Sequence, residues 1–154
     1  MNLSGKKMIL ALVVFSVFGS GPLLLPEAHA STQNYSLSGE HERDLALLVS
    51  QASHLDVALK TSIEGLQGAG PVKMGSASIV VCGKETVAVL KKGSIEEEKI
   101  NSAAKAGAKI IACGLSLTAA GIDPSELNSN IQIVPNGLWE MIRLQNLGAL
   151  SVDL

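Results

Sequence analysis

The chain has 154 residues, of which 47% are hydrophobic, together with a formal net charge of −2 and two cysteines. A charge this close to neutral predicts no basic surface for nucleic acid or for anionic lipid. A chain of this length suits one domain that buries a core without needing disulfides.

Residues 1–30 have the layout of a secretory signal peptide. Lys6 and Lys7 precede an apolar run from Met8 to Phe18, and small residues close the segment at Ala30. The alternative is an uncleaved anchor, but the run is shorter than the roughly 20 residues of a spanning helix. We therefore predict cleavage after Ala30 and a periplasmic or otherwise exported protein with no membrane attachment after cleavage.

Residues 31–41 form a polar lead-in, and residues 42–154 are expected to form the folded domain. The first element predicted is a long helix with Ser38 as its N-cap. Its apolar residues recur at steps of three and four, which is typical of one helix face: Leu45, Leu48, Ala52, Leu55, Leu59, Ile63 and Leu66. The segment "GLQGAGPVKMG" (65–75) then ends this helix and is interpreted as a linker.

From residue 77 onward, short apolar runs alternate with helical patterns. This alternation predicts an α/β fold with a mainly parallel sheet of four to five strands, covered by helices on both faces. Ser94 and Glu97 are spaced as a capping box, and Leu138, Trp139 and Ile142 are expected on the buried side of the last helix. The predicted strands and helices lie at 77–83, 84–93, 94–107, 108–114, 115–121, 131–135, 136–148 and 149–152.

Both cysteines are expected at the carboxyl edge of this sheet, where ligand crevices form in open parallel sheets. Cys82 and Cys113 each end a predicted strand and are followed by glycine. Unpaired N–H groups at a helix start favour a thiolate. Gly114 would leave the N–H groups of Leu115 and Ser116 open to a small anion.

Two other interpretations of these cysteines stay open. A free cysteine often fills a core as a small hydrophobe. A disulfide between Cys82 and Cys113 requires neighbouring strands about 4.8 Å apart, because two strands separated by a third lie beyond disulfide reach. The spacing of the two cysteines is a poor match for a zinc site, so we expect no metal.

The C-terminal half resembles the DsrE/DsrF-like family of sulfur-relay proteins. The resemblance rests on "KIIACGLSLTAAGIDPSEL" and "IQIVPNGLWEMIRLQNLGALSV", that is, a strand ending in A-C-G, a nearby Ser, a V-P-N-G strand end and an I-x-R-L-Q helix. It covers residues 77–154. The resemblance implies a three-layer α/β/α sandwich, assembly into homo- or hetero-oligomers, and a persulfide-carrying cysteine that matches Cys113.

The sequence also departs from the family pattern. Family members begin with an apolar strand before the first long helix, placed between the strands that here end in Cys82 and Cys113. No segment between Ser31 and Glu42 has that character, "NYSLS" being the nearest candidate. Without that strand, the two cysteine strands could pair directly and a disulfide could form.

The leading hypothesis is an exported sulfur carrier in which Cys113 takes sulfane sulfur from a small sulfur-containing anion or persulfide donor. It would pass the sulfur to an acceptor protein thiol, with Leu115, Ser116 and Asn136 steadying the anion and no organic cofactor. The alternatives are a non-catalytic interaction module or oligomer subunit, and a thiol-disulfide redox protein that uses Cys82 with Cys113.

Overall fold

The computed structural model describes residues 42–154, so the predicted signal peptide, its cleavage site and the lead-in lie outside the described residues. Five strands form one sheet in the order β4-β3-β2-β1-β5, and every neighbouring pair is parallel. The elements are β1 (Arg43–Val49), α1 (Leu55–Leu66), β2 (Met74–Val81), α2 (Glu97–Lys105), β3 (Lys109–Cys113), α3 (Gly114–Ala120), β4 (Ile131–Val134), α4 (Gly137–Asn146) and β5 (Leu150–Asp153), with short 3-10 helices at Ala52–His54, Val87–Leu90 and Pro124–Glu126.

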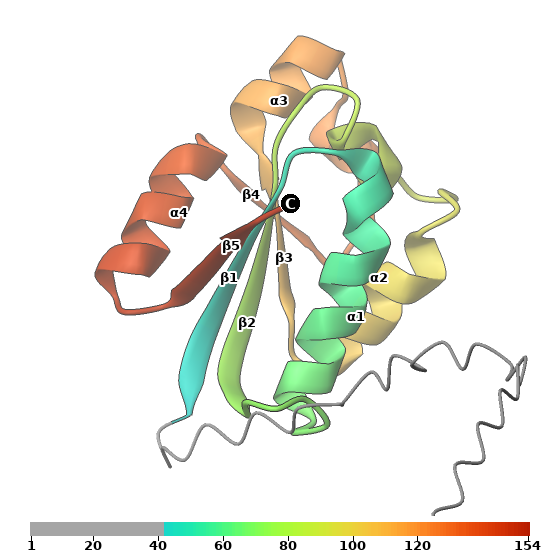
Figure 1. Cartoon of the computed structure of the whole chain (residues 1–154). Helices are drawn as coiled ribbons and strands as arrows, with labels where there is room; N and C mark the ends of the chain where they lie inside the picture. Colours follow the sequence, from blue (N-terminus) through green and yellow to red (C-terminus); the bar gives the residue numbers. More distant parts are fainter. Residues whose placement is uncertain (1–41) are drawn as a thin grey trace, which may run out of the picture. The chain divides into compact units, whose positions relative to one another are not determined.

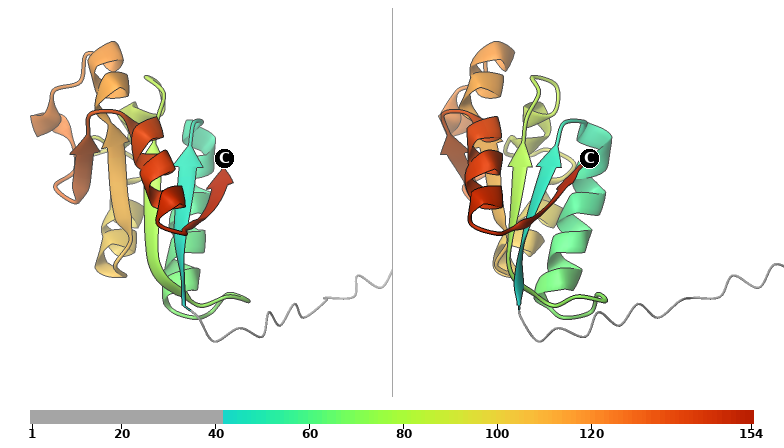
Figure 2. Two further views of the ribbon diagram at one scale, coloured as in Figure 1. Left: turned by 90° about the vertical axis from the view of Figure 1, so that its left-hand side faces the viewer. Right: turned by 60° about the vertical axis from the view of Figure 1, so that its left-hand side comes forward.

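Helices cover both faces of the sheet, which confirms the predicted α/β fold with a covered parallel sheet. Figures 1 and 2 show α1 and α2 on one face and α4 on the other. The larger core lies beneath α1, α2 and α3, and α4 closes a smaller core of Ala46, Val80, Ile111 and Met141. The structure is therefore a three-layer sandwich in which one outer layer consists of α4. No helix within residues 42–154 is long and apolar enough to span a membrane.

The long helix predicted from Ser38 to Leu66 is wrong in its first half. Residues 43–49 form β1, and only Leu55–Leu66 form a helix, α1. Leu45 and Leu47 are buried on one face of the sheet and Ala46 on the other, as in a strand covered on both sides. A continuous apolar run also satisfies helical spacing, which is why the periodicity misled.

The strand that seemed to be missing is therefore present as β1. It does not separate the two cysteine strands, because it lies between β2 and β5. β2 and β3 pair directly, which is the arrangement that the sequence left open, and the family order with a third strand between them does not hold in this chain.

The short helix predicted at 84–93 is present as a 3-10 helix at Val87–Leu90, with Val87 and Leu90 buried. One smaller prediction needs correction. The Ser94 and Glu97 capping box does not form, because the Glu97 carboxylate accepts a hydrogen bond from the Gly93 N–H at 2.7 Å. The remaining predicted strands and helices are present, with ends shifted by a few residues.

Candidate functional site

Cys113 is the last residue of β3 and directly precedes α3, as the sequence predicted. Its side chain lies on the α4 side of the sheet, where the Sγ accepts a hydrogen bond from the Gly137 N–H at 3.2 Å. Gly137 is the first residue of α4, whose unpaired N–H groups carry the positive end of the helix dipole. The environment of this sulfur therefore favours its anionic form.

Cys82 lies beside Cys113 on the neighbouring strand. β2 and β3 pair in register from Ser78 with Lys109 to Val81 with Ala112, and one further step places Cys82 opposite Cys113. Cys82 packs against the same small core beneath α4. Both cysteines are free thiols in the structure.

The pKa values of the two thiols are shifted in opposite directions. Burial acts to raise the pKa of Cys113, yet hydrogen bonds from the Gly137 N–H and from the hydroxyl and N–H of Ser116 leave that pKa lowered. The Cys82 thiol adds a smaller contribution in the same direction. Burial, followed by the nearby charge and hydrogen bond of Cys113, raises the pKa of Cys82 to about 12. Cys113 is therefore the more acidic thiol of the pair, and Cys82 keeps its proton near neutral pH.

Ser116 connects the two cysteine loops. Its Oγ accepts a hydrogen bond from the Gly83 N–H at 2.9 Å, immediately after Cys82. The hydroxyl and the N–H of Ser116 are also among the causes of the lowered pKa of Cys113. Ser116 thus acts as a positioning residue that holds the chain beyond Cys82 and also stabilises the Cys113 thiolate.

Gly137 is the residue that brings α4 against both sulfurs. A methyl group at this position would come within 2.6 Å of the Cys82 Sγ and 3.0 Å of the Cys113 Cβ. Any side chain would therefore push the helix start away from the thiols. The sequence reasoning missed Gly137; the available signal was the "PNG" that follows β4, in which Asn136 caps a helix and Gly137 opens it.

The predicted anion site at the start of α3 is occupied by the protein itself. The Leu115 N–H donates to the Pro135 carbonyl at 3.2 Å, so it is not open to an external anion. Gly114 packs against the same connection, since a methyl group there would lie 3.0 Å from the Val134 carbonyl oxygen. Gly114 therefore allows the chain to pack closely at this point.

Asn136 serves as the N-cap of α4, the simpler of the two roles that the sequence offered for it. Its side-chain oxygen accepts a hydrogen bond from the Leu138 N–H at 3.0 Å. The group that contacts the sulfur is the N–H of the next residue, Gly137. Asn136 therefore positions the helix start whose amide contacts Cys113.

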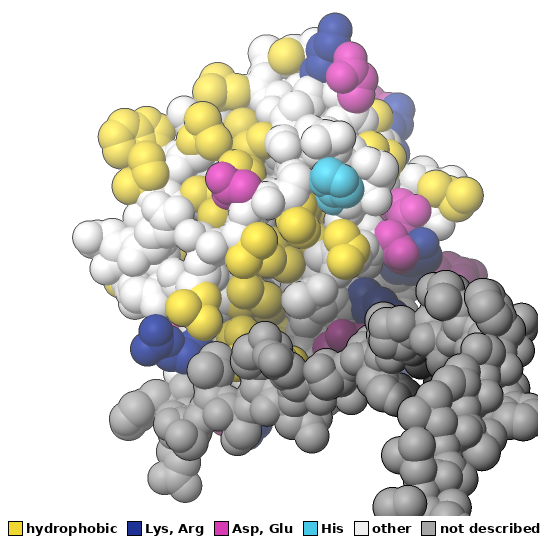
Figure 3. Space-filling view, viewed as in Figure 1, with side chains coloured by type: hydrophobic (Ala, Val, Ile, Leu, Met, Phe, Trp, Pro, Cys, Tyr) yellow, Lys and Arg dark blue, Asp and Glu magenta, His cyan; other side chains and the backbone are white. Residues whose placement is uncertain are grey.

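The apolar residues expected on the buried side of α4 are exposed instead. Leu138, Trp139 and Ile142 have 55%, 68% and 51% of their surface exposed, whereas Met141 is 4% exposed. Apolar side chains gather on the molecular surface over α4 and α3 (Figure 3). Both stripes of this helix are apolar, and the stripe containing Met141 faces the sheet.

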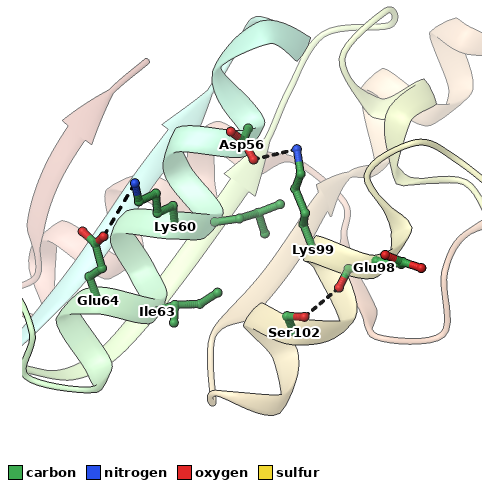
Figure 4. Close-up of a pocket in the computed structure, with 8 residues that line it drawn as sticks. Asp56, Lys60, Ile63, Glu64, Glu98, Lys99 and Ser102 are labelled. Atoms are coloured by element: carbon green, nitrogen blue, oxygen red, sulfur yellow. Dashed lines mark hydrogen bonds and ion pairs between the residues drawn. The ribbon is translucent and has the colours of Figure 1, made fainter.

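A separate hollow lies between α1 and α2, on the face of the sheet away from the cysteines (Figure 4). Lys99 bridges the two helices through Asp56 at 2.7 Å, and Lys60 lies 3.9 Å from Glu64. Apart from Glu98, the charged side chains that line the hollow are paired with one another, and no cysteine or histidine lines it. We therefore place the candidate site at the thiols. The hollow is lined by Asp56, Leu59, Lys60, Ile63, Glu64, Glu98, Lys99 and Ser102.

Together, the fold and the site define a three-layer α/β protein with two free thiols side by side at the carboxyl edge of a parallel sheet, of which Cys113 is the more acidic. No protein-family model matches the chain, and no curated protein does. Among solved structures, it is similar to a protein of unknown function from Methanobacterium thermoautotrophicum, MTH1491, with 20% identity and a TM-score of 0.60. That match covers 74% of this chain and all of that one.

A second similar structure is a conserved protein of unknown function from Bacteroides thetaiotaomicron, BT1422. It shares 15% identity with a TM-score of 0.57, covering 72% of this chain and 94% of that one. At these identities the two likenesses show the fold alone.

Proposed function

We propose that this protein is an exported sulfur carrier of the DsrE/DsrF type, which holds sulfane sulfur as a persulfide on Cys113. The observation that carries the proposal is the hydrogen bond from the Gly137 N–H to the Cys113 Sγ at the start of α4. This contact, with those from Ser116, lowers the pKa of a thiol that burial alone would raise. A lowered pKa provides the thiolate that attacks sulfur.

The loading step conserves atoms and electrons. The Cys113 thiolate attacks the outer sulfur of a thiosulfate or polysulfide anion, a new S–S bond forms on Cys113, and the donor's S–S bond breaks. The electron pair of that bond leaves with the remainder of the donor, as sulfite or a shorter polysulfide. An acceptor thiolate later removes the outer sulfur and restores the Cys113 thiolate.

Burial sets a condition on this chemistry. Cys113 is only 4% exposed, so the donor reaches it when the chain around the two cysteines opens locally. The exposed apolar surface of α4, beside the sulfur, provides a docking area for an acceptor or for further subunits. Export of the mature protein after cleavage at Ala30 belongs to the same proposal.

The test is intact-mass spectrometry of the purified protein after incubation with thiosulfate or polysulfide. Wild type is expected to gain one sulfur atom that a thiol reductant removes, and Cys113→Ser is expected to gain none. An equal gain on both proteins would remove Cys113 from the role.

A second function is favoured by the same burial. With Cys113 almost sealed and α4 presenting Leu138 and Trp139 to solvent, the domain could serve as a non-catalytic subunit. Alkylation of Cys113 across pH 5 to 9 separates the two. A carrier cysteine reacts with a midpoint below that of a free cysteine measured in parallel, and a packing cysteine does not react while the protein is folded.

A further inference from the structure

Cys82 has no task in the carrier mechanism, although its place in the fold is well defined. It follows β2 directly, is half-buried, and lies opposite Cys113 on the same side of the sheet. The Cys82 Sγ and the Cys113 Cβ both border the same point beside Gly137, at 2.6 Å and 3.0 Å. Two sulfurs that share one small space can react with each other.

The strand arrangement permits a bond between them. Neighbouring parallel strands lie about 4.8 Å apart, which is within the Cα separation of roughly 4.4–6.8 Å found in disulfides. Cys82 is also followed by Gly83 at a φ of 98°, so the bridge would join the end of β3 to the start of a loop. The sheet itself need not move.

We infer that Cys82 is a resolving thiol that discharges the Cys113 persulfide when no acceptor is docked, an activity that rests on the proposed carrier function. The Cys82 sulfur attacks the inner sulfur of Cys113, a Cys82–Cys113 disulfide forms, and the bond to the outer sulfur breaks. The outer sulfur leaves as hydrosulfide and takes the electron pair. It is reduced to sulfide while the two cysteine sulfurs are oxidised, and the proton of Cys82 leaves with it. A thiol reductant from the surroundings returns the pair to its starting state.

Loading favours this reaction in two ways. The outer sulfur draws the negative charge away from the Cys113 Sγ, which removes one of the causes that keep Cys82 protonated. The added atom must also fit into a space already filled by Cys82, Gly137 and Val80, so expulsion of sulfide relieves crowding. Neither effect is present before loading, so the unloaded cysteines remain free thiols.

The experiment compares wild type, Cys82→Ser and Cys113→Ser after anaerobic loading with inorganic polysulfide and removal of the excess by gel filtration. Wild type is expected to lose its added sulfur with time, to lose two hydrogen atoms in mass, and to release one sulfide per protein. Cys82→Ser is expected to keep the sulfur on Cys113 at least tenfold longer and to release sulfide only when a reductant is added. Cys113→Ser gives the background.

The results separate this inference from the carrier function. If Cys82→Ser takes no sulfur on Cys113, the carrier function fails. If Cys82→Ser loads and then loses its sulfur as fast as wild type, the carrier function stands and the resolving role is overturned. Peptide mapping of wild type under non-reducing conditions gives a check without any variant: sulfide release with no linked Cys82–Cys113 peptides also overturns it.

Discussion

Gly137→Ala is the substitution that tests the thiolate site most sharply. The new methyl group would lie 2.6 Å from the Cys82 Sγ and 3.0 Å from both the Cys113 Cβ and the Val80 Cγ1. The 2.6 Å contact requires a shift, and the two 3.0 Å contacts require their neighbours to give by a few tenths of an ångström, so we expect the start of α4 to move away from the sulfurs. That movement removes the 3.2 Å hydrogen bond to the Cys113 Sγ.

The size of the effect follows from that bond. A hydrogen bond to a charged group contributes about 1.5–3 kcal/mol, and each 1.36 kcal/mol is a factor of ten in the ionisation equilibrium. At a pH below the ionisation midpoint, the alkylation rate of Cys113 should therefore fall about 10- to 100-fold. Overpacking should also lower the free energy of unfolding by about 1–3 kcal/mol.

The assay is iodoacetamide alkylation as a function of pH, with the modification of Cys113 followed by peptide mass spectrometry so that Cys82, whose Sγ makes the 2.6 Å contact, stays in place. Gly65→Ala is the matched control, since its methyl group would lie 2.8 Å from the flexible Met74 side chain on the other face of the sheet. It should leave the alkylation profile unchanged. A folded Gly137→Ala protein with the parent profile would refute the claim that the α4 amide stabilises the thiolate.

Three further predictions concern the same residues. Ser116→Ala should slow alkylation of Cys113 several-fold and cost about 1 kcal/mol of unfolding free energy in urea denaturation, because a thiolate donor and a loop contact are both lost. The two cysteines together should make the reduced protein most stable near about pH 8.5, the pKa of a cysteine in the unfolded chain. The lowered pKa of Cys113 makes the free energy of unfolding rise as the pH approaches about 8.5 from below. The raised pKa of Cys82, about 12, makes the free energy of unfolding fall as the pH increases from about 8.5 toward 12. Trp139→Ser should change the free energy of unfolding by less than about 0.5 kcal/mol, whereas Met141→Ala should cost about 2–5 kcal/mol.

Each of these has an outcome that would count against it. Unchanged alkylation in Ser116→Ala would remove its hydroxyl from thiolate stabilisation. Stability that continues to rise above pH 9 would contradict the protonated state assigned to Cys82. A large loss of stability in Trp139→Ser would mean that this face of α4 is covered in solution.

The sequence predicted most of the fold from residue 77 onward, because each strand there is a short apolar run bounded by glycine or proline and each helix has its own start and stop residues. It failed at residues 43–49. A strand buried on both faces shows no alternation, so Leu45 and Leu48 fitted a helical repeat equally well. The true length of the first helix depends on tertiary burial, which local spacing does not record.

The candidate site was predicted in part. The edge position of Cys113 follows from strand and helix order alone, and the structure confirms it. The acidity of Cys113 depends on Gly137, which lies 24 residues further along the chain, and no local pattern indicates that contact. The sequence also did not determine which face of α4 packs against the sheet, since both the stripe containing Trp139 and the stripe containing Met141 are apolar.

The most direct test of the central claim is the state of Cys113 in protein taken from its native compartment. The protein would be blocked with an alkylating reagent during extraction, digested, and read by peptide mass spectrometry without reduction. The account predicts a Cys113 peptide that carries one extra sulfur atom beneath the alkyl group, and its loss after treatment with a reductant. A Cys113 peptide that never carries extra sulfur, under conditions in which the protein is folded and sulfane sulfur is abundant, would contradict it.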